Sequence, residues 1–297
     1  MHERLVHSNT SSDFGDRSIA PEFFGDDLVR CKFMSPRKPA ESRPSSNSKK
    51  SSKEKALLQE VDRRLTVYGN SRHHNRDDVL EELVFIILSA QTESYLYRRT
   101  FEDLLARFPT WESMLAATED EIAVAIRRGG LAKKKASQLK RALEKIKADT
   151  GALSLEFLRE LPNAEALRYL TSLAGIGNKS AACIMMYSLR RQVFPVDTHV
   201  WRVCRRLGLT PPVPKPTDVQ ERELESKVPP DIRYSLHVNM VSHGQQTCTT
   251  YWPKCDSCVL ADICPSRNKP DEVWGQWRKP RGVWAKALNG AEPPKRK

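Results

Sequence analysis

The stretch Leu173-Ala174-Gly175-Ile176-Gly177-Asn178-Lys179-Ser180-Ala181 joins two segments of helical periodicity, residues 164–173 and 179–189. The two glycines allow a tight turn and a close approach of the backbone to another molecule. The isoleucine between them would plug the gap between the helices, and the amides that begin the second helix would point outward as a phosphate site. The stretch predicts a helix-hairpin-helix, a motif that grips a nucleic-acid backbone without reading its sequence. An ordinary interhelical turn with glycines at a helix C-terminus is the other interpretation.

Helical periodicity extends on both sides of this hairpin. Apolar residues recur at spacings of three and four from Lys55 onward, the pattern of helices with one buried face. Pro109 ends one apolar stripe, Gly129-Gly130 ends the next, and Thr118 with Glu121 forms a capping box between them. No stretch alternates like a strand, so the sequence predicts an all-α fold.

Residues 132–149 divide into an apolar stripe and a charged face. The stripe consists of Leu139, Leu143 and Ile146. Above it we expect a basic face made of Lys133, Lys134, Lys135, Lys140 and Arg141.

Lys179 occupies the first turn of the second hairpin helix, where the helix dipole disfavours a cation. We expect its amine to be strained towards the neutral form, which is a nucleophile able to form a Schiff base. A solvated lysine that contacts phosphate is the alternative.

Asp197 follows Lys179 by eighteen residues, in Phe194-Pro195-Val196-Asp197-Thr198-His199-Val200. Its position before the next helical segment predicts an N-cap. Facing a lysine across a cleft, the same carboxylate would stabilise positive charge developing on a sugar and help to manage protons.

Four cysteines, Cys248, Cys255, Cys258 and Cys264, have the spacing C-x6-C-x2-C-x5-C within seventeen residues. Thiolates so close in sequence can converge on one metal centre, whereas an intracellular setting disfavours disulfides. Zinc sites usually pair two C-x2-C-like units, and this sequence has only one x2 pair. The spacing therefore favours a [4Fe-4S] cluster over zinc, which stays the alternative.

Length and charge narrow the class further. The 297 residues carry 49 Lys plus Arg against 37 Asp plus Glu, a net charge of +12 that favours polyanionic partners. No apolar run is long enough to span a membrane, and the N-terminus lacks the basic-then-apolar pattern of a secretory signal. We expect an intracellular protein with a disordered basic arm over residues 1–53 and a basic, tryptophan-containing tail over residues 268–297.

Together these features resemble the endonuclease III family of helix-hairpin-helix DNA glycosylases. The resemblance covers residues 55–267, and its motifs occur in the family's order: Leu88-Ser89-Ala90-Gln91-Thr92, the Gly-Ile-Gly-Asn-Lys hairpin, Val196-Asp197-Thr198-His199, Arg202-Val203-Cys204, His243-Gly244 and the four cysteines. It implies two helical domains with a DNA cleft between them. Residues 76–195 would form a six-helix barrel that ends in the hairpin, and residues 54–75 with 196–267 a [4Fe-4S] cluster domain.

The resemblance also implies an activity. The protein would be a monomeric, DNA-associated, bifunctional DNA glycosylase and abasic-site lyase that excises modified pyrimidines from duplex DNA in base excision repair. Lys179 would be its nucleophile and Asp197 its carboxylate, while Gln91 would enter the duplex where the damaged base is flipped out. The remaining DNA contacts would come from Gly175, Ile176, Gly177, Thr198 and His199.

Some positions depart from the family pattern. Ala174 stands where proline is common, and Asn178 where a basic residue is common. Residues 151–170 and Ser180-Ala181-Ala182-Cys183 resemble instead the plant branch that excises 5-methylcytosine. A 5-methylcytosine or mismatch-directed glycosylase is therefore one alternative, and a non-catalytic DNA-binding module with a redox-sensing cluster is another.

Overall fold

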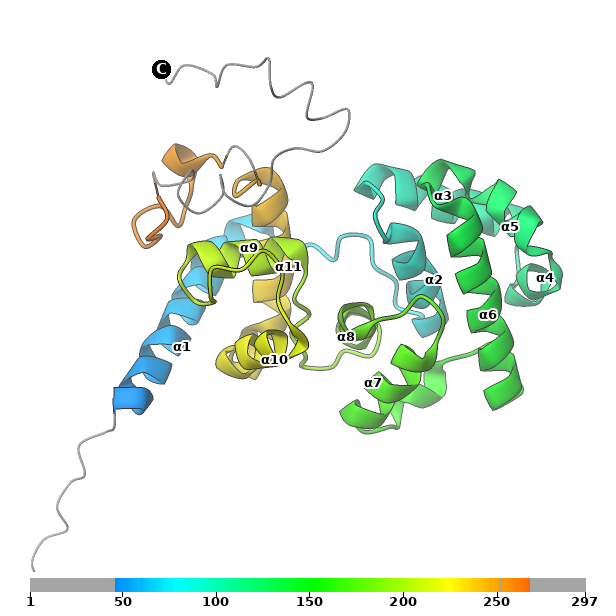
Figure 1. Ribbon diagram of the computed structural model, residues 1–297, viewed down its shortest axis with the longest axis horizontal. Coiled ribbons are helices and arrows are strands. Elements are labelled where there is room, and N and C mark those ends of the chain that lie inside the picture. The colour runs from blue at the N-terminus through cyan, green and yellow to red at the C-terminus, as the bar shows by residue number, and fades with distance from the viewer. Residues whose placement is uncertain (1–45, 251–252, 268–297) are drawn as a thin grey trace, which may run out of the picture. The chain divides into compact units, whose positions relative to one another are not determined.

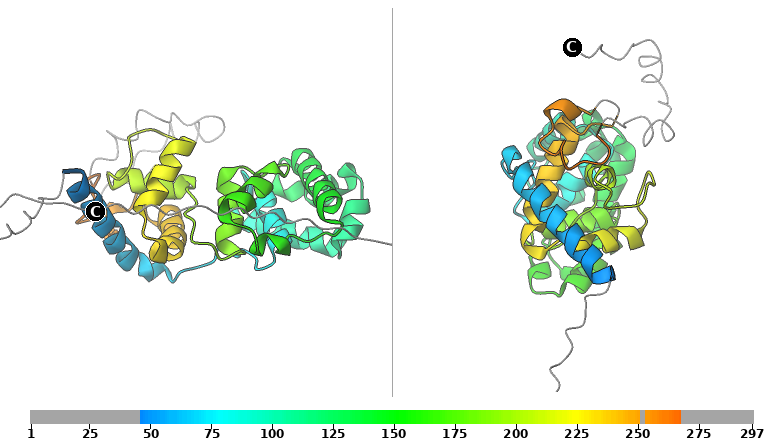
Figure 2. Two further views of the ribbon diagram at one scale, coloured as in Figure 1. Left: turned by 90° about the horizontal axis from the view of Figure 1, so that it is seen from below. Right: turned by 90° about the vertical axis from the view of Figure 1, so that its left-hand side faces the viewer.

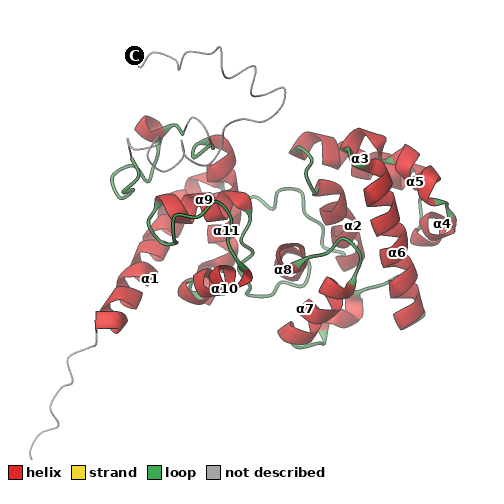
Figure 3. Ribbon diagram, viewed as in Figure 1, coloured by secondary structure: helices red, strands yellow, loops and turns green. Residues whose placement is uncertain are grey.

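The computed structural model describes residues 46–250 and 253–267, which all lie in one of the two units of the chain, residues 44–297. Every regular element in the described residues is helical, as Figure 3 shows. The α-helices are α1 Ser46–Leu65, α2 Val79–Ser89, α3 Ser94–Arg107, α4 Trp111–Ala116, α5 Glu119–Ala125, α6 Ala132–Thr150, α7 Asn163–Ser172, α8 Asn178–Tyr187, α9 Thr198–Arg206, α10 Asp218–Lys227 and α11 Arg233–Gln246. The all-α prediction is confirmed.

In the same described residues, five short 3-10 helices complete the elements: η1 Thr66–Tyr68, η2 Arg127–Gly129, η3 Glu156–Arg159, η4 Pro230–Ile232 and η5 Cys255–Ser257. Among the described residues no helix combines the length and the apolar character needed to cross a bilayer.

Local sequence signals account for several helix ends. Thr118 and Glu121 form the predicted capping box of α5, each side chain bonding the other's backbone N–H. The sequence predicted that this helix would end at Gly129-Gly130, but α5 ends at Ala125. The residues between this end and Gly130 include the 3-10 helix η2, Arg127–Gly129. Helix α1 begins at Ser46 and so includes residues 46–53, which the sequence assigned to the basic arm. Extending an existing helix costs less than nucleating one, so a polar Ser- and Lys-rich segment can continue it. The rest of the arm and the tail of residues 268–297 lie outside the described residues.

Two clusters of buried apolar side chains organise the described residues. Figures 1 and 2 show the helices that contribute to them. The first takes its residues from positions 79–189 and from Val238, and its helices are α2 to α8. The second joins α1 to the helices that follow residue 194, and includes Leu58, Val61, Leu65, Trp201, Leu224, Leu236 and Leu260. The chain passes between the clusters through residues 66–78 and 190–193.

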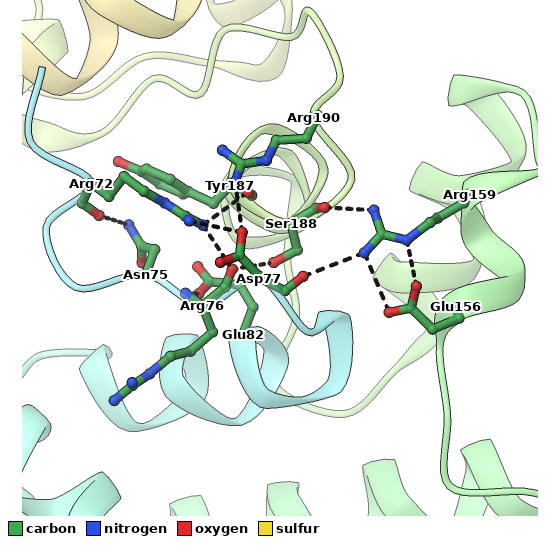
Figure 4. A network of polar contacts seen from close by, with 10 residues as sticks. All are labelled: Arg72, Asn75, Arg76, Asp77, Glu82, Glu156, Arg159, Tyr187, Ser188 and Arg190. Atoms are coloured by element: carbon green, nitrogen blue, oxygen red, sulfur yellow. Dashed lines mark hydrogen bonds and ion pairs between the residues drawn. The ribbon is translucent and has the colours of Figure 1, made fainter.

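A polar network fixes the first of these connections, as Figure 4 shows. Arg72 donates to the carbonyl of Tyr187 at 3.2 Å and pairs with Asp77 at 2.8 Å, and Asp77 also pairs with Arg190 at 2.6 Å. Ser188 donates to the carbonyl of Arg76. The connection is thereby held against the end of α8.

Candidate active site

The glycine pair shapes the turn between α7 and α8. Gly175 has φ +87°, and a Cβ there would lie 2.9 Å from Cδ of Gln138, so glycine is required for both reasons. Gly177, the N-cap of α8, has an ordinary φ, and nothing lies within 4 Å of where its Cβ would be. Ile176 is buried between the helices, with 5% of its surface exposed. The helix-hairpin-helix prediction is confirmed, and the backbone at the start of α8 faces open space.

Asn178 follows Gly177, and its side chain already has a hydrogen-bond partner. Its amide donates to Oδ2 of Asp218, the first residue of α10, at 3.1 Å. Where a basic side chain would attract phosphate, this chain therefore places an amide bonded to a carboxylate.

Lys179, the second residue of α8, lines a cavity of about 320 Å³. Side chains from α2, α3, α8, α9, α11 and the connection before α2 surround this space. Its wall includes Asp197 and His199 from the motif that the sequence singled out. The other ionisable groups on the wall, which sequence reasoning missed, are His73, His74, Tyr97, Arg98, Cys183, Tyr187 and His237.

Asp197 caps α9, as its position predicted. One carboxylate oxygen, Oδ1, accepts from the backbone N–H of both His199 and Val200, each at 2.8 Å. Burial opposes ionisation of this carboxyl, but the charge of Lys179 and the N–H of Val200 favour the carboxylate, and the pKa is lowered. His199 and His237 act in the same direction only when protonated, and burial lowers the pKa of both. Asp197 is thus a carboxylate at neutral pH.

The groups around Lys179 bear on the expectation that its amine is strained towards the neutral form. Ionised Cys183, one turn along α8, and the carboxylate of Asp197 raise the pKa of Lys179, and burial only partly opposes them. Burial also raises the pKa of Cys183 to about 11, so at neutral pH that thiol is uncharged and Asp197 is the remaining anion. With Cys183 protonated, burial and the carboxylate of Asp197 act on the amine in opposite directions. The strain of Lys179 towards the neutral form therefore stays a prediction.

Comparison with known proteins places this geometry in a family. Residues 84–230 match the family described as "HhH-GPD superfamily base excision DNA repair protein". Endonuclease III from Buchnera aphidicola is 30% identical over 191 residues, covering 64% of this chain and 83% of that protein. The chain belongs to the HhH-GPD superfamily.

Two relatives from Arabidopsis thaliana match a shorter part. The protein called "Putative DNA glycosylase At3g47830" is 37% identical over 171 residues, which are 57% of each chain. "DNA glycosylase/AP lyase ROS1" is 32% identical over 170 residues, 52% of this chain but 12% of that protein. The chain thus matches about half of the first plant relative's length and a small part of the second.

The fold agrees with solved structures. A trapped endonuclease III–DNA covalent intermediate has a TM-score of 0.60 and 24% identity, covering 72% of this chain and 97% of that chain. A thermostable thymine-DNA glycosylase has a TM-score of 0.61 and 18% identity, covering 75% and 100%.

The other residues expected to contact DNA in this HhH-GPD protein lie near the cavity or on exposed turns. His199 is half-buried on the cavity wall, and its Nδ1 lies 2.9 Å from Nη2 of Arg202. Thr198, the first residue of α9, is exposed. Gln91 is exposed in the turn after α2, where it adopts a left-handed backbone with φ 53°.

Lys135 is not on the exposed basic face of α6, where the sequence placed it. Only 1% of its surface is exposed. The reason lies in the helical repeat, because residue 135 precedes Leu139 by four and thus continues the stripe of Leu139, Leu143 and Ile146. This spacing could have predicted the burial of Lys135 from the sequence, but its charge led to the opposite prediction.

The four cysteines of the C-x6-C-x2-C-x5-C motif line one hollow together with Arg206 and His243. Arg206 donates to Sγ of Cys248 at 2.9 Å, and the backbone N–H of Leu260 donates to Sγ of Cys258 at 3.4 Å. Burial raises the pKa of Cys258, and the other three cysteines act in the same direction. Within residues 46–250 and 253–267, no group of His, Cys, Asp and Glu is gathered as the ligand set of a single metal ion. Four soft sulfur donors that share one hollow, with N–H groups aimed at two of them, fit an iron–sulfur cluster.

Proposed function

We propose that this protein is a bifunctional enzyme of base excision repair, a DNA glycosylase and abasic-site lyase that acts on modified pyrimidines in duplex DNA. The observation that carries the proposal is the pairing of Lys179 with Asp197 on one cavity, beside the open start of α8. A glycosylase that only hydrolyses the base needs no amine there, whereas a lyase does.

The proposed reaction uses the amine of Lys179 and the carboxylate of Asp197. Lys179 must lose a proton before its Nζ can attack C1′ of the flipped nucleotide, and ionised Asp197 is the group on the wall that relays this proton. The N-glycosidic bond breaks with its electron pair on the base, which takes up the proton. Asp197, as a carboxylate again, stabilises the positive charge that develops on the sugar.

Strand cleavage uses the covalent link that remains. Opening of the sugar ring leaves an iminium between Nζ of Lys179 and C1′. This electron sink acidifies C2′, so loss of a C2′ proton expels the 3′ phosphate by β-elimination. Water then hydrolyses the iminium and releases Lys179.

Residues around the cavity are proposed to contact DNA. The turn of Gly175, Ile176 and Gly177 is proposed to bind a phosphate, because no described atom lies within 4 Å of the Cβ position of Gly177. The N–H of Ile176 already donates to the carbonyl of Leu173 at 3.2 Å, so the other amides of the turn are the proposed donors. Gln91 is proposed to fill the space left by the flipped nucleotide, and Thr198 and His199 to contact the strand that carries it. The domain division of the sequence analysis remains a proposal, which the two separate hydrophobic clusters support.

We further propose that Cys248, Cys255, Cys258 and Cys264 hold a [4Fe-4S] cluster. The cluster would supply structural cross-linking of the segment after α11 and a site for electron transfer. The glycosidic and elimination steps transfer no electrons, so they are left to Lys179 and Asp197.

A panel of duplexes tests the function and its alternatives. Each duplex carries one lesion, namely oxidised thymine, oxidised cytosine, 5-methylcytosine, or uracil or thymine opposite guanine, and is scored for base release and for nicking without added alkali. Nicking of the oxidised pyrimidines supports the proposal, and nicking only at 5-methylcytosine or at mismatches supports the alternative substrates. Base release without nicking would contradict the lyase, and tight binding without either reaction would favour the non-catalytic module.

A further inference from the structure

Lys135 is a buried lysine that has no carboxylate beside it in the part of the chain that the structure describes. Its Nζ donates to the carbonyl of Leu88 at 2.7 Å, to Oγ1 of Thr92 at 2.6 Å and to the carbonyl of Gly129 at 3.0 Å. Burial lowers its pKa to about 8, so the amine is still largely protonated at pH 7. The three N–H bonds of the ammonium thus match three acceptors.

The three acceptors belong to two separate turns. Leu88 lies in the last turn of α2 and Thr92 follows Gln91, so both flank the exposed glutamine. Gly129 lies in η2, two residues before Leu131, whose side chain is 48% exposed. The hydroxyl of Thr92 donates onward to the carbonyl of Gly129 at 2.6 Å, so the two turns are joined directly as well as through the lysine.

Both turns contain a residue with a strained backbone. Gln91 has φ 53° and Leu131 has φ 52°, a left-handed conformation that costs a non-glycine residue of order 1 kcal/mol or more. Such residues persist only where neighbouring contacts fix them. A buried ammonium is itself expensive to desolvate, so packing alone does not explain a lysine at this position.

We propose that Lys135 is a positioning residue that clamps the Gln91 turn and the Leu131 turn into one rigid wedge, which parts the stacked bases of the target duplex. The inference rests on the proposed function, since it concerns how the target nucleotide reaches the cavity. Lys135 touches neither DNA nor the reacting atoms. Its effect is confined to the step in which a paired base is unstacked.

Two substrates separate this step from the chemistry. A lesion paired within a duplex must be unstacked, whereas an abasic site in a single strand needs no wedge. In Lys135→Met, which keeps the length and loses the donors, release of the paired lesion should slow about tenfold or more, because small misplacements of a positioning group have large effects. Cleavage of the single-stranded abasic site should stay within about twofold of the parent protein. Lys147→Met, an exposed lysine near the end of α6, is the control and should change neither rate.

Further variants keep the test sharp if Lys135→Met folds poorly. Thr92→Val removes one acceptor of the lysine while keeping the size of the side chain, and should show a weaker form of the same selective loss. Gln91→Ala should reproduce the selective loss, and the double variant Gln91→Ala with Lys135→Met should lose no more than the larger single effect. Equal loss on both substrates, no loss on either, or additive effects in the double variant would overturn the proposal. Failure of the parent protein to cleave either substrate would count instead against the proposed function.

Discussion

Asp197 combines two roles in one carboxylate. Its Oδ1 caps α9 through two backbone N–H groups, and its charge faces Lys179 across the cavity. Asparagine keeps the capping oxygen and removes the charge, so one substitution separates the roles.

The Asp197→Asn variant should therefore keep the stability of the parent protein and lose on the order of 10²-fold in the rate of base release, as expected for a lost charge-stabilising group. Single-turnover kinetics and thermal unfolding measure the two effects. Asp78→Asn is the matched control, since Asp78 caps α2 by accepting from Glu81 N–H at 2.8 Å. If stability and rate fell together in Asp197→Asn, its role would be capping alone.

Glu82 is a buried carboxyl that the sequence did not single out. Its Oε2 accepts from the backbone N–H of Arg76 at 2.5 Å, and its Oε1 has no hydrogen-bond partner among the described residues. Burial raises its pKa from 4.5 to about 8, although Arg72, Arg76 and Lys179 oppose the shift. Between these two pKa values the folded protein binds a proton that the unfolded chain has lost, so Glu82 lowers the stability as the pH rises.

We predict that Glu82→Gln stabilises the protein at pH 8 and changes it little near pH 5. The penalty removed grows by roughly 1.4 kcal/mol per pH unit across this window, because glutamine imitates the protonated carboxyl. Denaturant unfolding at several pH values measures it, with Glu81→Gln on the same helix as the control. A stability difference that does not depend on pH would contradict the assignment of Glu82 as a neutral buried acid.

At the scale of the hairpin, Gly175 and Gly177 make different demands. The first needs both a positive φ and the absence of a Cβ, whereas the second has neither restriction from the protein itself. If the amides at the start of α8 bind phosphate, the open space in front of Gly177 is needed for DNA and not for folding.

Gly175→Ala should thus lower the free energy of unfolding by about 1 kcal/mol or more, since both the backbone and the contact with Gln138 are strained. Gly177→Ala should leave the melting temperature unchanged and weaken DNA binding, because the added methyl group obstructs the approach of phosphate. Thermal unfolding and fluorescence anisotropy with a duplex measure these outcomes. Full DNA affinity in Gly177→Ala would argue against a phosphate site at this turn.

Helix ends and helix faces were the elements that the sequence predicted best. The capping box at Thr118 and the N-cap at Asp197 are local interactions, so their residues suffice to predict them. Lys135 shows the limit, because two of its acceptors, the carbonyl of Leu88 and the hydroxyl of Thr92, lie more than forty positions away in the sequence. The surroundings of Lys179 lay beyond the sequence for the same reason, since Asp197 meets it on the cavity wall only through the fold.

At the scale of the whole described unit, the periodicity of apolar residues could not predict which distant helices pack together. Helix α1 packs with helices that follow residue 194, and only the family resemblance implied this return of the chain. The spacing of apolar residues in α1 shows which face of the helix is buried, but it does not identify the helices that cover this face. The sequence could predict that the four cysteines lie close together, because all of them belong to one short segment.

The cysteine segment gives a prediction for the folded unit. Cys258→Ser should lose the brown visible absorbance and the bound iron expected of a [4Fe-4S] protein and should destabilise the part that contains the second hydrophobic cluster, because cluster binding and folding are coupled. Cys204→Ala, a buried cysteine of that hydrophobic cluster away from the motif, should keep the colour. A colourless parent protein that contains zinc would overturn the assignment.

The central claim is that Nζ of Lys179 becomes covalently joined to the sugar. Sodium borohydride reduces such an imine to a stable bond, so it is added while the protein cleaves a duplex with an abasic site, and the adduct is mapped by mass spectrometry. The account predicts one protein–DNA adduct, located on Lys179, and none in Lys179→Gln, which should still fold because the side chain borders an open cavity. An adduct on another amine, or trapping that persists in Lys179→Gln, would contradict it.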